Sequence, residues 1–199
     1  MILGIDTSGD VCYIALINGL SGDIKATQFS HNRQLIEQLP ARIEAFLADA
    51  EVCFQDVDCL ACGTGPGSFT GVRVGVMYAK TLAFALGKPI IGISSFDAAA
   101  YENISISRAV VCPSKRNEVI AAVYPAYATS PSIGPVAVAT DDWDAWLAEH
   151  LPSIELTIGQ GIDGALTPTG NLALGACLLA DPLLAQRSFS DIDSLIPHY

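Results

Sequence analysis

The sequence has few basic residues. Lys and Arg number 10 against 21 Asp and Glu in a chain of 199 residues, which gives a formal net charge of −11. Proteins that bind nucleic acid alone neutralise phosphates with Lys and Arg and release counterions. This chain is therefore a poor lone binder of tRNA or DNA, although it can serve RNA chemistry in a complex whose other subunit makes the contacts.

Segments that could span a membrane are also lacking. The uncharged run at residues 164–180 is short and is interrupted by Pro168 and Gly170. No basic segment leads into an apolar stretch near Met1, as a signal peptide requires. We expect a soluble protein of the cytoplasm that makes no membrane contact.

Metal and disulfide patterns are missing as well. The six cysteines have no framework spacing, and Cys59 and Cys62 have no second pair to complete a zinc site. The three histidines form no His-x-x-x-His, and no Ser–His–Asp arrangement is evident. We expect reduced, mostly buried thiols, no metal site and no catalytic residue.

The apolar residues that are present predict a two-lobed α/β protein. Hydrophobic residues make up 51% of the chain, enough for a core in one domain or two small lobes. The first half has the order strand-strand-strand-helix-strand-helix-strand, which is the order of a ribonuclease-H-like lobe. The expected ranges are strands at 2–6, 11–18, 24–29, 57–62 and 89–94, and helices at 35–50, 69–86 and 96–102.

The second half reads as a shorter version of the same lobe. Strands are expected at 109–112, 118–124, 133–139 and 154–158, with helices from 143 and at 171–180. We therefore predict two ribonuclease-H-like lobes of the actin-like ATPase and sugar-kinase architecture. The N-terminal lobe is placed at residues 1–104 and a reduced C-terminal lobe at residues 105–199.

A glycine-rich segment at residues 63–75 joins a strand to the long helix. Its backbone N–H groups can face an anion at the helix N-terminus, but a tight turn capped by Ser68 or Thr70 has the same pattern. No Walker A motif is present, since Pro89 follows Gly87-Lys88. Together with the tip of the first hairpin, the segment supplies a candidate vestigial phosphate site of Asp6, Thr7, Ser8, Gly65 and Gly67.

The long helix is apolar around most of its circumference. Small residues recur along it every four positions, and larger apolar residues line much of the rest. Such a helix buries two faces, and we favour docking of a partner helix on the small-residue face over packing against this chain's own sheet alone. The residues concerned are Gly71, Val72, Gly75, Val76, Ala79 and Ala83.

With these segments taken together, the chain resembles the bacterial TsaB (YeaZ) family. The resemblance covers most of the first lobe. Its carriers are residues 5–8 (Ile-Asp-Thr-Ser), His31 with Leu35, the segment 65–75, Ala79-Lys80 and residues 89–94 (Pro-Ile-Ile-Gly-Ile-Ser), with looser matches at 116–119 and 197–199.

The resemblance implies a non-catalytic scaffold in the complex that forms N6-threonylcarbamoyladenosine at position 37 of tRNAs reading codons that start with A. The implied partners are a TsaD-type transferase, a TsaE-type ATPase and a second copy of this chain, with tRNA reached only through the complex. No cofactor is implied, except ATP or ADP at a subunit junction. The two first-lobe helices would carry the interface, which adds Leu35, Leu39 and Ile43 to the six residues above.

The sequence departs from the catalytic relatives at two positions. Ser95 and Ala99 stand where those proteins carry a metal-binding His-x-x-x-His, and neither residue can hold iron or zinc. Pro113 replaces an expected aspartate before residues 116–119. The alternatives are an actin-like ATPase or small-molecule kinase, and, less favoured for want of metal ligands, a metallopeptidase of the glycoprotease type.

Overall fold

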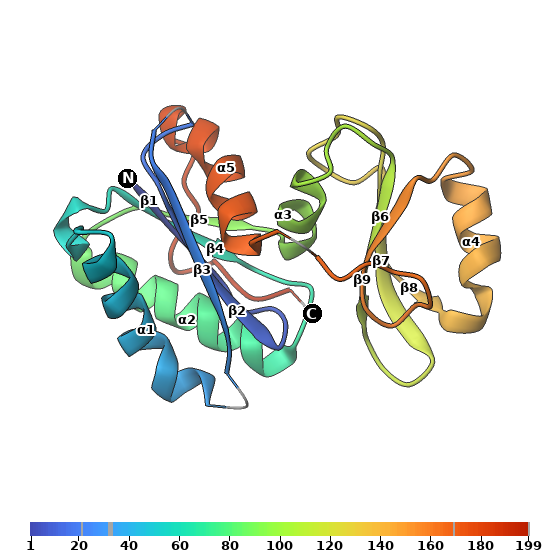
Figure 1. The fold of residues 1–199 in the computed structure, drawn as a ribbon, viewed down its shortest axis with the longest axis horizontal. Helices are drawn as coiled ribbons and strands as arrows, with labels where there is room; N and C mark the ends of the chain where they lie inside the picture. The colour runs from blue at the N-terminus through green and yellow to red at the C-terminus, as the bar shows by residue number, and fades with distance from the viewer. Residues whose placement is uncertain (21, 32–33, 169, 199) are drawn as a thin grey trace. The chain divides into compact units, whose positions relative to one another are not determined.

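A computed structural model describes residues 1–20, 22–31, 34–168 and 170–198, and Figure 1 shows the fold. The chain forms two compact units. Unit 1 consists of Met1–Ser95 together with the segment from Asn171 onwards, and unit 2 consists of Phe96–Gly170. None of the described helices is long and apolar enough to cross a bilayer.

Unit 1 is built on a five-stranded mixed sheet. The strand order is β3-β2-β1-β4-β5, in which β1, β2 and β3 pair antiparallel and β1, β4 and β5 pair parallel. A mixed sheet of this kind confirms the predicted ribonuclease-H-like fold class. The strands are β1 (Ile2–Asp6), β2 (Val11–Ile17), β3 (Ile24–Ser30), β4 (Cys59–Gly63) and β5 (Ile90–Ile93).

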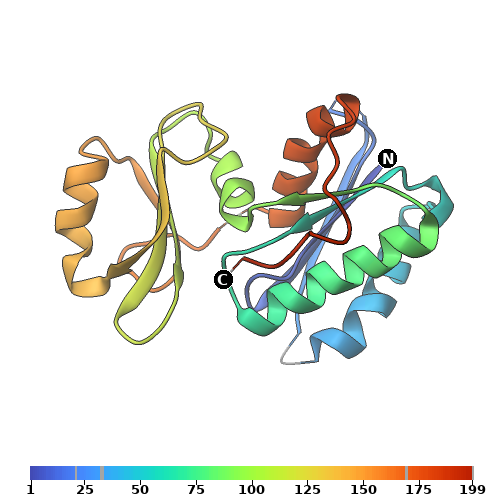
Figure 2. The same cartoon turned by 180° about the vertical axis from the view of Figure 1, so that it is seen from behind.

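Helices cover both faces of this sheet (Figures 1 and 2). Leu3 and Ile5 of β1 join a core with α1 (Leu35–Asp49) and α2 (Phe69–Leu86). Gly4, which points to the other face, lies against Ala173 and Cys177 of α5 (Leu172–Ala185). A short 3-10 turn, η1 (Phe54–Asp56), precedes β4.

The limits of α2 follow from its caps. The side chain of Ser68 accepts a hydrogen bond from the backbone N–H of Gly71, and Gly87 ends the helix in the left-handed conformation with φ of 63°. The helix therefore spans the predicted residues 69–86, and Ser68 rather than Thr70 is its N-cap.

The small residues of α2 serve a close approach within unit 1. Gly71 and Gly75 face Thr7, whose hydroxyl donates a 2.7 Å hydrogen bond to the carbonyl oxygen of Gly71. A Cβ at Gly71 would overlap the carbonyl oxygen of Thr7, and one at Gly75 would overlap its hydroxyl. The helix can lie this close to the end of β1 only because both side chains are absent.

Unit 2 repeats the same plan in reduced form. Its strand order is β8-β7-β6-β9, with β6, β7 and β8 antiparallel and β6 and β9 parallel. This matches the order β3-β2-β1-β4, and the described residues of unit 2 add no counterpart of β5. Its elements are α3 (Ser95–Tyr101, starting at the end of unit 1), β6 (Arg108–Pro113), β7 (Glu118–Tyr124), β8 (Ile133–Ala139), η2 (Thr140–Asp142), α4 (Trp143–His150) and β9 (Leu156–Gly159).

Two kinds of contact hold unit 2 together. Trp143 of α4 packs on Val111, Val119 and Val138 of the sheet. Beside this core, the buried guanidinium of Arg108 donates hydrogen bonds to backbone carbonyls and lies over the Tyr124 ring at 5.3 Å. The carbonyls belong to Ala100, Ile106, Pro125 and Ala128.

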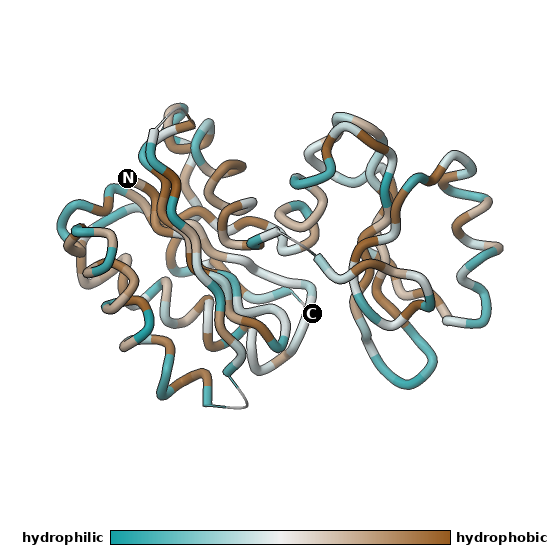
Figure 3. The backbone as a smooth tube through the Cα atoms, in the orientation of Figure 1, coloured by the Kyte–Doolittle hydropathy of each residue, from teal (hydrophilic) through white to brown (hydrophobic). Residues whose placement is uncertain are grey.

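The unit boundary differs from the one expected from the sequence. Residues 171–198 do not belong to a C-terminal lobe at 105–199, and the first boundary falls after Ser95 rather than after residue 104. The reason is that α5 covers the open face of the first sheet. At its N-terminus the Asn171 amide donates hydrogen bonds to the carbonyls of Ile14 and Thr27 at 3.3 and 2.8 Å. Figure 3 shows how hydrophobic residues concentrate along these strands and along α5.

Gly71→Ala tests the close approach of α2 to β1. The added methyl group must displace backbone at Thr7, so we expect a loss of unfolding free energy of about 1–3 kcal/mol. Thr70→Ala, at the exposed position one residue earlier, should change stability by less than about 0.5 kcal/mol. Urea unfolding followed by circular dichroism measures both. Equal stability of the two variants would contradict the packing described here.

Candidate functional site

The end of β1 carries the polar residues predicted to face a phosphate. Asp6 is fully buried, and its Oδ1 accepts hydrogen bonds from the Ser8 N–H at 2.8 Å and the Ser8 hydroxyl at 2.6 Å. Its Oδ2 accepts a 2.7 Å hydrogen bond from the hydroxyl of Ser95. Burial raises the pKa of Asp6, and the hydrogen bonds from Ser8 and Ser95 oppose that rise. The carboxylate is therefore engaged within unit 1.

The glycine-rich loop between β4 and α2 packs against the same residues. The N–H of Gly65 donates to the Ser95 hydroxyl at 3.1 Å, and the N–H of Ser68 donates to the Ser8 carbonyl at 2.6 Å. Gly65 has φ of 91° and approaches the backbone of His198, while Gly67 approaches that of Ser8. The structure brings Asp6, Thr7, Ser8, Gly65 and Gly67 together at the start of α2. The loop forms a tight turn with Ser68 as the N-cap of α2, and the anion site stays a prediction.

Ser95 is the residue whose role here the sequence reasoning missed. It is buried at the start of α3 and joins the Asp6 carboxylate to the loop N–H of Gly65. Ala99, one turn further along α3, is also buried. The sequence had marked both positions only as replacements of metal-ligating histidines. A hydroxyl at position 95 with an acid at the end of the first strand was the available signal.

Burial of the thiols follows the expectation for four of the six cysteines. All six are free in the structure, and Cys12, Cys59, Cys62 and Cys177 are buried. Burial raises the pKa of Cys59 to about 11 and that of Cys62 to about 12, which keeps both thiols protonated and unreactive at neutral pH. Within the part of the chain that the structure describes, no three His, Cys, Asp or Glu side chains gather as a metal site would need.

The residues expected at a partner interface lie in the core of unit 1. All nine are buried, and seven of them have apolar side chains that pack with β1 and β4. Direct contact between these side chains and a partner is therefore a wrong prediction, because the small-residue face of α2 is already covered by this chain's own strands. The nine are Leu35, Leu39, Ile43, Gly71, Val72, Gly75, Val76, Ala79 and Ala83.

The opposite faces of the same helices carry exposed apolar side chains. On α2, Phe69 is 57% exposed, Met77 59% and Phe84 80%, and on α1 Ile36 is 70% exposed. The guanidinium of Arg73 lies over the Phe69 ring at 5.2 Å. Positions 69, 73, 77 and 84 share one side of the helix. We call Phe69, Met77 and Phe84 the outer strip of α2; large exposed apolar residues grouped in this way are typical of protein interfaces.

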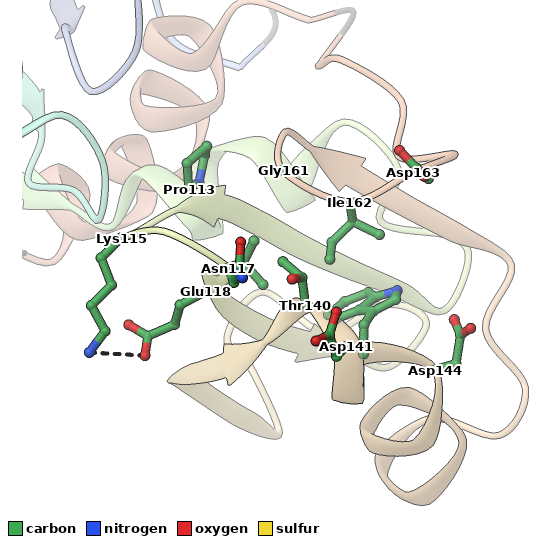
Figure 4. Close-up of a pocket in the computed structure, with 12 residues that line it drawn as sticks. Pro113, Lys115, Asn117, Glu118, Thr140, Asp141, Asp144, Gly161, Ile162 and Asp163 are labelled. Atoms are coloured by element: carbon green, nitrogen blue, oxygen red, sulfur yellow. Dashed lines mark ion pairs between the residues drawn. The ribbon is translucent and has the colours of Figure 1, made fainter.

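Unit 2 contains a separate hollow of about 620 Å³ (Figure 4). Its walls carry the carboxylates of Glu118, Asp141, Asp144 and Asp163, and Lys115 pairs with Glu118 at 3.1 Å. Pro113, which replaces the expected aspartate, lies at its edge. The acidic lining opposes binding of phosphate or nucleic acid in this hollow.

Comparison with known proteins identifies the family. The family model for "TsaD: tRNA N6-adenosine threonylcarbamoyltransferase" matches residues 29–169, more than half of the chain. The chain is 37% identical over 110 residues to the tRNA threonylcarbamoyladenosine biosynthesis protein TsaB of Haemophilus influenzae, which is 54% of this chain and 45% of that protein. The chain belongs to this family, among its TsaB (YeaZ) members.

Further relatives support the assignment to this family. TsaB of Escherichia coli is 36% identical over 94 residues, which is 47% of this chain and 40% of that protein. The chain thus matches less than half the length of these curated relatives. The solved structure of YeaZ from Pseudomonas aeruginosa is similar in fold, with a TM-score of 0.80 and 22% identity over 100% of this chain and 98% of that one. This chain and that YeaZ structure therefore share their fold over almost the full length of both chains.

Asp6→Asn tests the electrostatic account of the loop junction. Because burial raises the folded-state pKa above that of the unfolded chain, the contribution of Asp6 to stability is greatest below about pH 4 and is lost as pH rises through the folded pKa. The variant has no group to ionise there, so its unfolding free energy should fall less over this window. Urea unfolding at a series of pH values measures the difference.

The exposed neighbour Asp10 provides the control for this measurement. Asp10→Asn should leave the pH profile of unfolding parallel to that of the unaltered chain. A profile of Asp6→Asn that falls as steeply as the unaltered one would show that Asp6 is not the group responsible.

Proposed function

We propose that this chain is a non-catalytic subunit of the machinery that forms N6-threonylcarbamoyladenosine in tRNA. Its partner is a TsaD-type transferase, which it binds through the outer faces of α1 and α2. The observation that carries the proposal is the exposure of the outer strip of α2 together with Ile36 of α1. These large apolar side chains face solvent, whereas the inner faces of both helices are already packed against the core of unit 1. The proposed reaction is inferred from the names of the relatives, a tRNA threonylcarbamoyladenosine biosynthesis protein and a tRNA N6-adenosine threonylcarbamoyltransferase.

The absence of chemistry in this subunit rests on the residues at α3 and at the loop. Ser95 and Ala99 cannot ligate a metal as histidines do, and Ser95 is used to hold Asp6 and Gly65. The hydroxyls and N–H groups around Asp6 make hydrogen bonds within the chain. We infer that the subunit binds no nucleotide alone, and that ATP or ADP is held only where a partner completes a site.

The charge and the surface of the chain support the proposed roles of the remaining partners. With a net charge of −11, the subunit reaches tRNA only through the complex. A second copy of the chain would cover the same outer strip in the absence of the transferase, so homodimer and transferase complex compete. A TsaE-type ATPase joins the assembly. A stable interface of this kind buries on the order of 1,600 Å².

Charged substitutions in the outer strip should abolish docking without unfolding the chain. In Met77→Asp with Phe84→Asp, two carboxylates replace side chains that a partner would desolvate, so we expect the affinity for the transferase to fall at least about 100-fold. Because both positions are exposed in the free chain, the melting temperature should stay within a few degrees. Titration calorimetry with a purified TsaD-type transferase measures the affinity.

Leu166→Asp is the matched control, because Leu166 is 57% exposed but lies in unit 2. It should bind the transferase like the unaltered chain. Formation of threonylcarbamoyladenosine in tRNA is then scored with transferase alone, with the unaltered chain added and with each variant. Unchanged binding by the double variant, or modification by this chain without the transferase, would disprove the proposal.

A further inference from the structure

Residues 188–198 form an irregular segment across unit 1, which we call the strap; it contains a turn at residues 192–194, where the N–H of Leu195 donates to the Asp191 carbonyl at 2.9 Å. It leaves the end of α5 and crosses the edge of β5, where the N–H of Ser190 donates to the Ile90 carbonyl at 2.9 Å and the Ser190 hydroxyl accepts from the N–H of Gly92 at 3.0 Å. It ends on the glycine-rich loop, where the N–H of His198 donates to the Thr64 carbonyl at 2.7 Å.

The surface beneath the strap fits its side chains. Ile192 and Leu195 pack against the core of unit 1. Leu195 lies over Gly92, where an added Cβ would stand 2.5 Å from its Cδ1. From α2, the Lys80 ammonium donates to the carbonyl of Leu195 at 3.0 Å and to that of Asp193 at 3.4 Å. The surface formed by the edge of β5, Thr64 and Lys80 therefore contacts both the backbone of the strap and the side chains at fixed positions along it.

The strap is held far less firmly than the strands that it covers. It pairs with β5 through a single bridge, whereas β4 and β5 pair over four residues. Most of its side chains are exposed, including Phe189 at 44% and Ile196 at 60%. Segments with few buried apolar contacts and exposed hydrogen bonds open at a lower free energy than the whole domain. Opening the strap would leave the outer edge of β5 without its cover.

We propose that the edge of β5, with Thr64 and Lys80, is a docking surface for a peptide that pairs with the edge at one residue and then turns, and that the strap occupies it in a releasable way. The occupant in trans is the strap of a second copy, because the contacts of that sequence with this surface are those already made within the chain. The surface binds three residues of the peptide: a hydroxyl residue, an aliphatic residue two positions after it, and a leucine five positions after it. In the strap these are Ser190, Ile192 and Leu195. Adding a strand to an open sheet edge is a common mode of peptide recognition.

Amide hydrogen exchange of the full chain tests the release. The amides of Ser190, Gly92 and His198 depend on the strap, whereas those of Leu60 and Thr64 bond to Pro89 and Ile93 within the strand ladder. We expect the first group to exchange at least 10-fold faster than the second, after correction for intrinsic rates. Equal exchange in both groups would mean that the strap opens only on global unfolding and would overturn the proposal.

A strap variant tests the docking in trans while leaving the surface unaltered. Leu195→Ala should raise exchange at Gly92 about 10-fold, and an excess of a synthetic peptide with the sequence of residues 188–198 should restore its protection. Ile196→Ala, at the exposed next position, should leave exchange at Gly92 unchanged. The control peptide carries Ala in place of its Leu. Failure of the unaltered peptide to protect Gly92, or equal protection by the control peptide, would overturn the proposal.

Discussion

Close approach of backbones around the loop between β4 and α2 is the constraint on which unit 1 depends. Three segments that are remote in sequence meet there: the end of β1 at Thr7, the start of α3 at Ser95 and the strap at His198. Each of these segments lies so close to a glycine that a Cβ added to that glycine would overlap the segment or displace it. The glycines of β4, the loop and α2 thus allow the close approach that fixes α2 against the sheet.

The cost of this junction is a buried carboxylate. Asp6 is removed from water, and its charge is stabilised by three hydrogen bonds from Ser8 and Ser95 rather than by a cation in the described part of the chain. Burial outweighs these bonds, which is why the pKa of Asp6 rises. Because the carboxylate also orders Ser8, which accepts the N–H of Ser68, the same group positions the N-cap of α2. These polar groups therefore take part in holding the fold of unit 1 together.

The sequence predicted the succession of strands and helices along both units and the limits of α2, because alternation of apolar residues, helix caps and glycines are local signals. It did not predict which apolar face of α2 is covered by its own chain. Small residues at Gly71 and Ala79 fit a neighbouring strand and a partner helix equally well, so periodicity alone cannot separate the two. The same limit explains the misplaced α5: a helix apolar on all sides, such as Leu172–Ala185, packs wherever an open sheet face is available, and that face lies 170 residues earlier in the chain.

The apolar side chains of α2 that stay exposed after this packing indicate where a partner could bind. Small side chains allow α2 to bury one face completely, so the large side chains of Phe69, Met77 and Phe84 are left on the other with no sheet to cover them. Large apolar side chains that stay in water gain no burial free energy when this chain folds. The outer strip is therefore the surface on which the proposed partner would dock. The close approach of α2 to β1 therefore has two results: the loop serves as a structural junction, and the outer strip stays exposed.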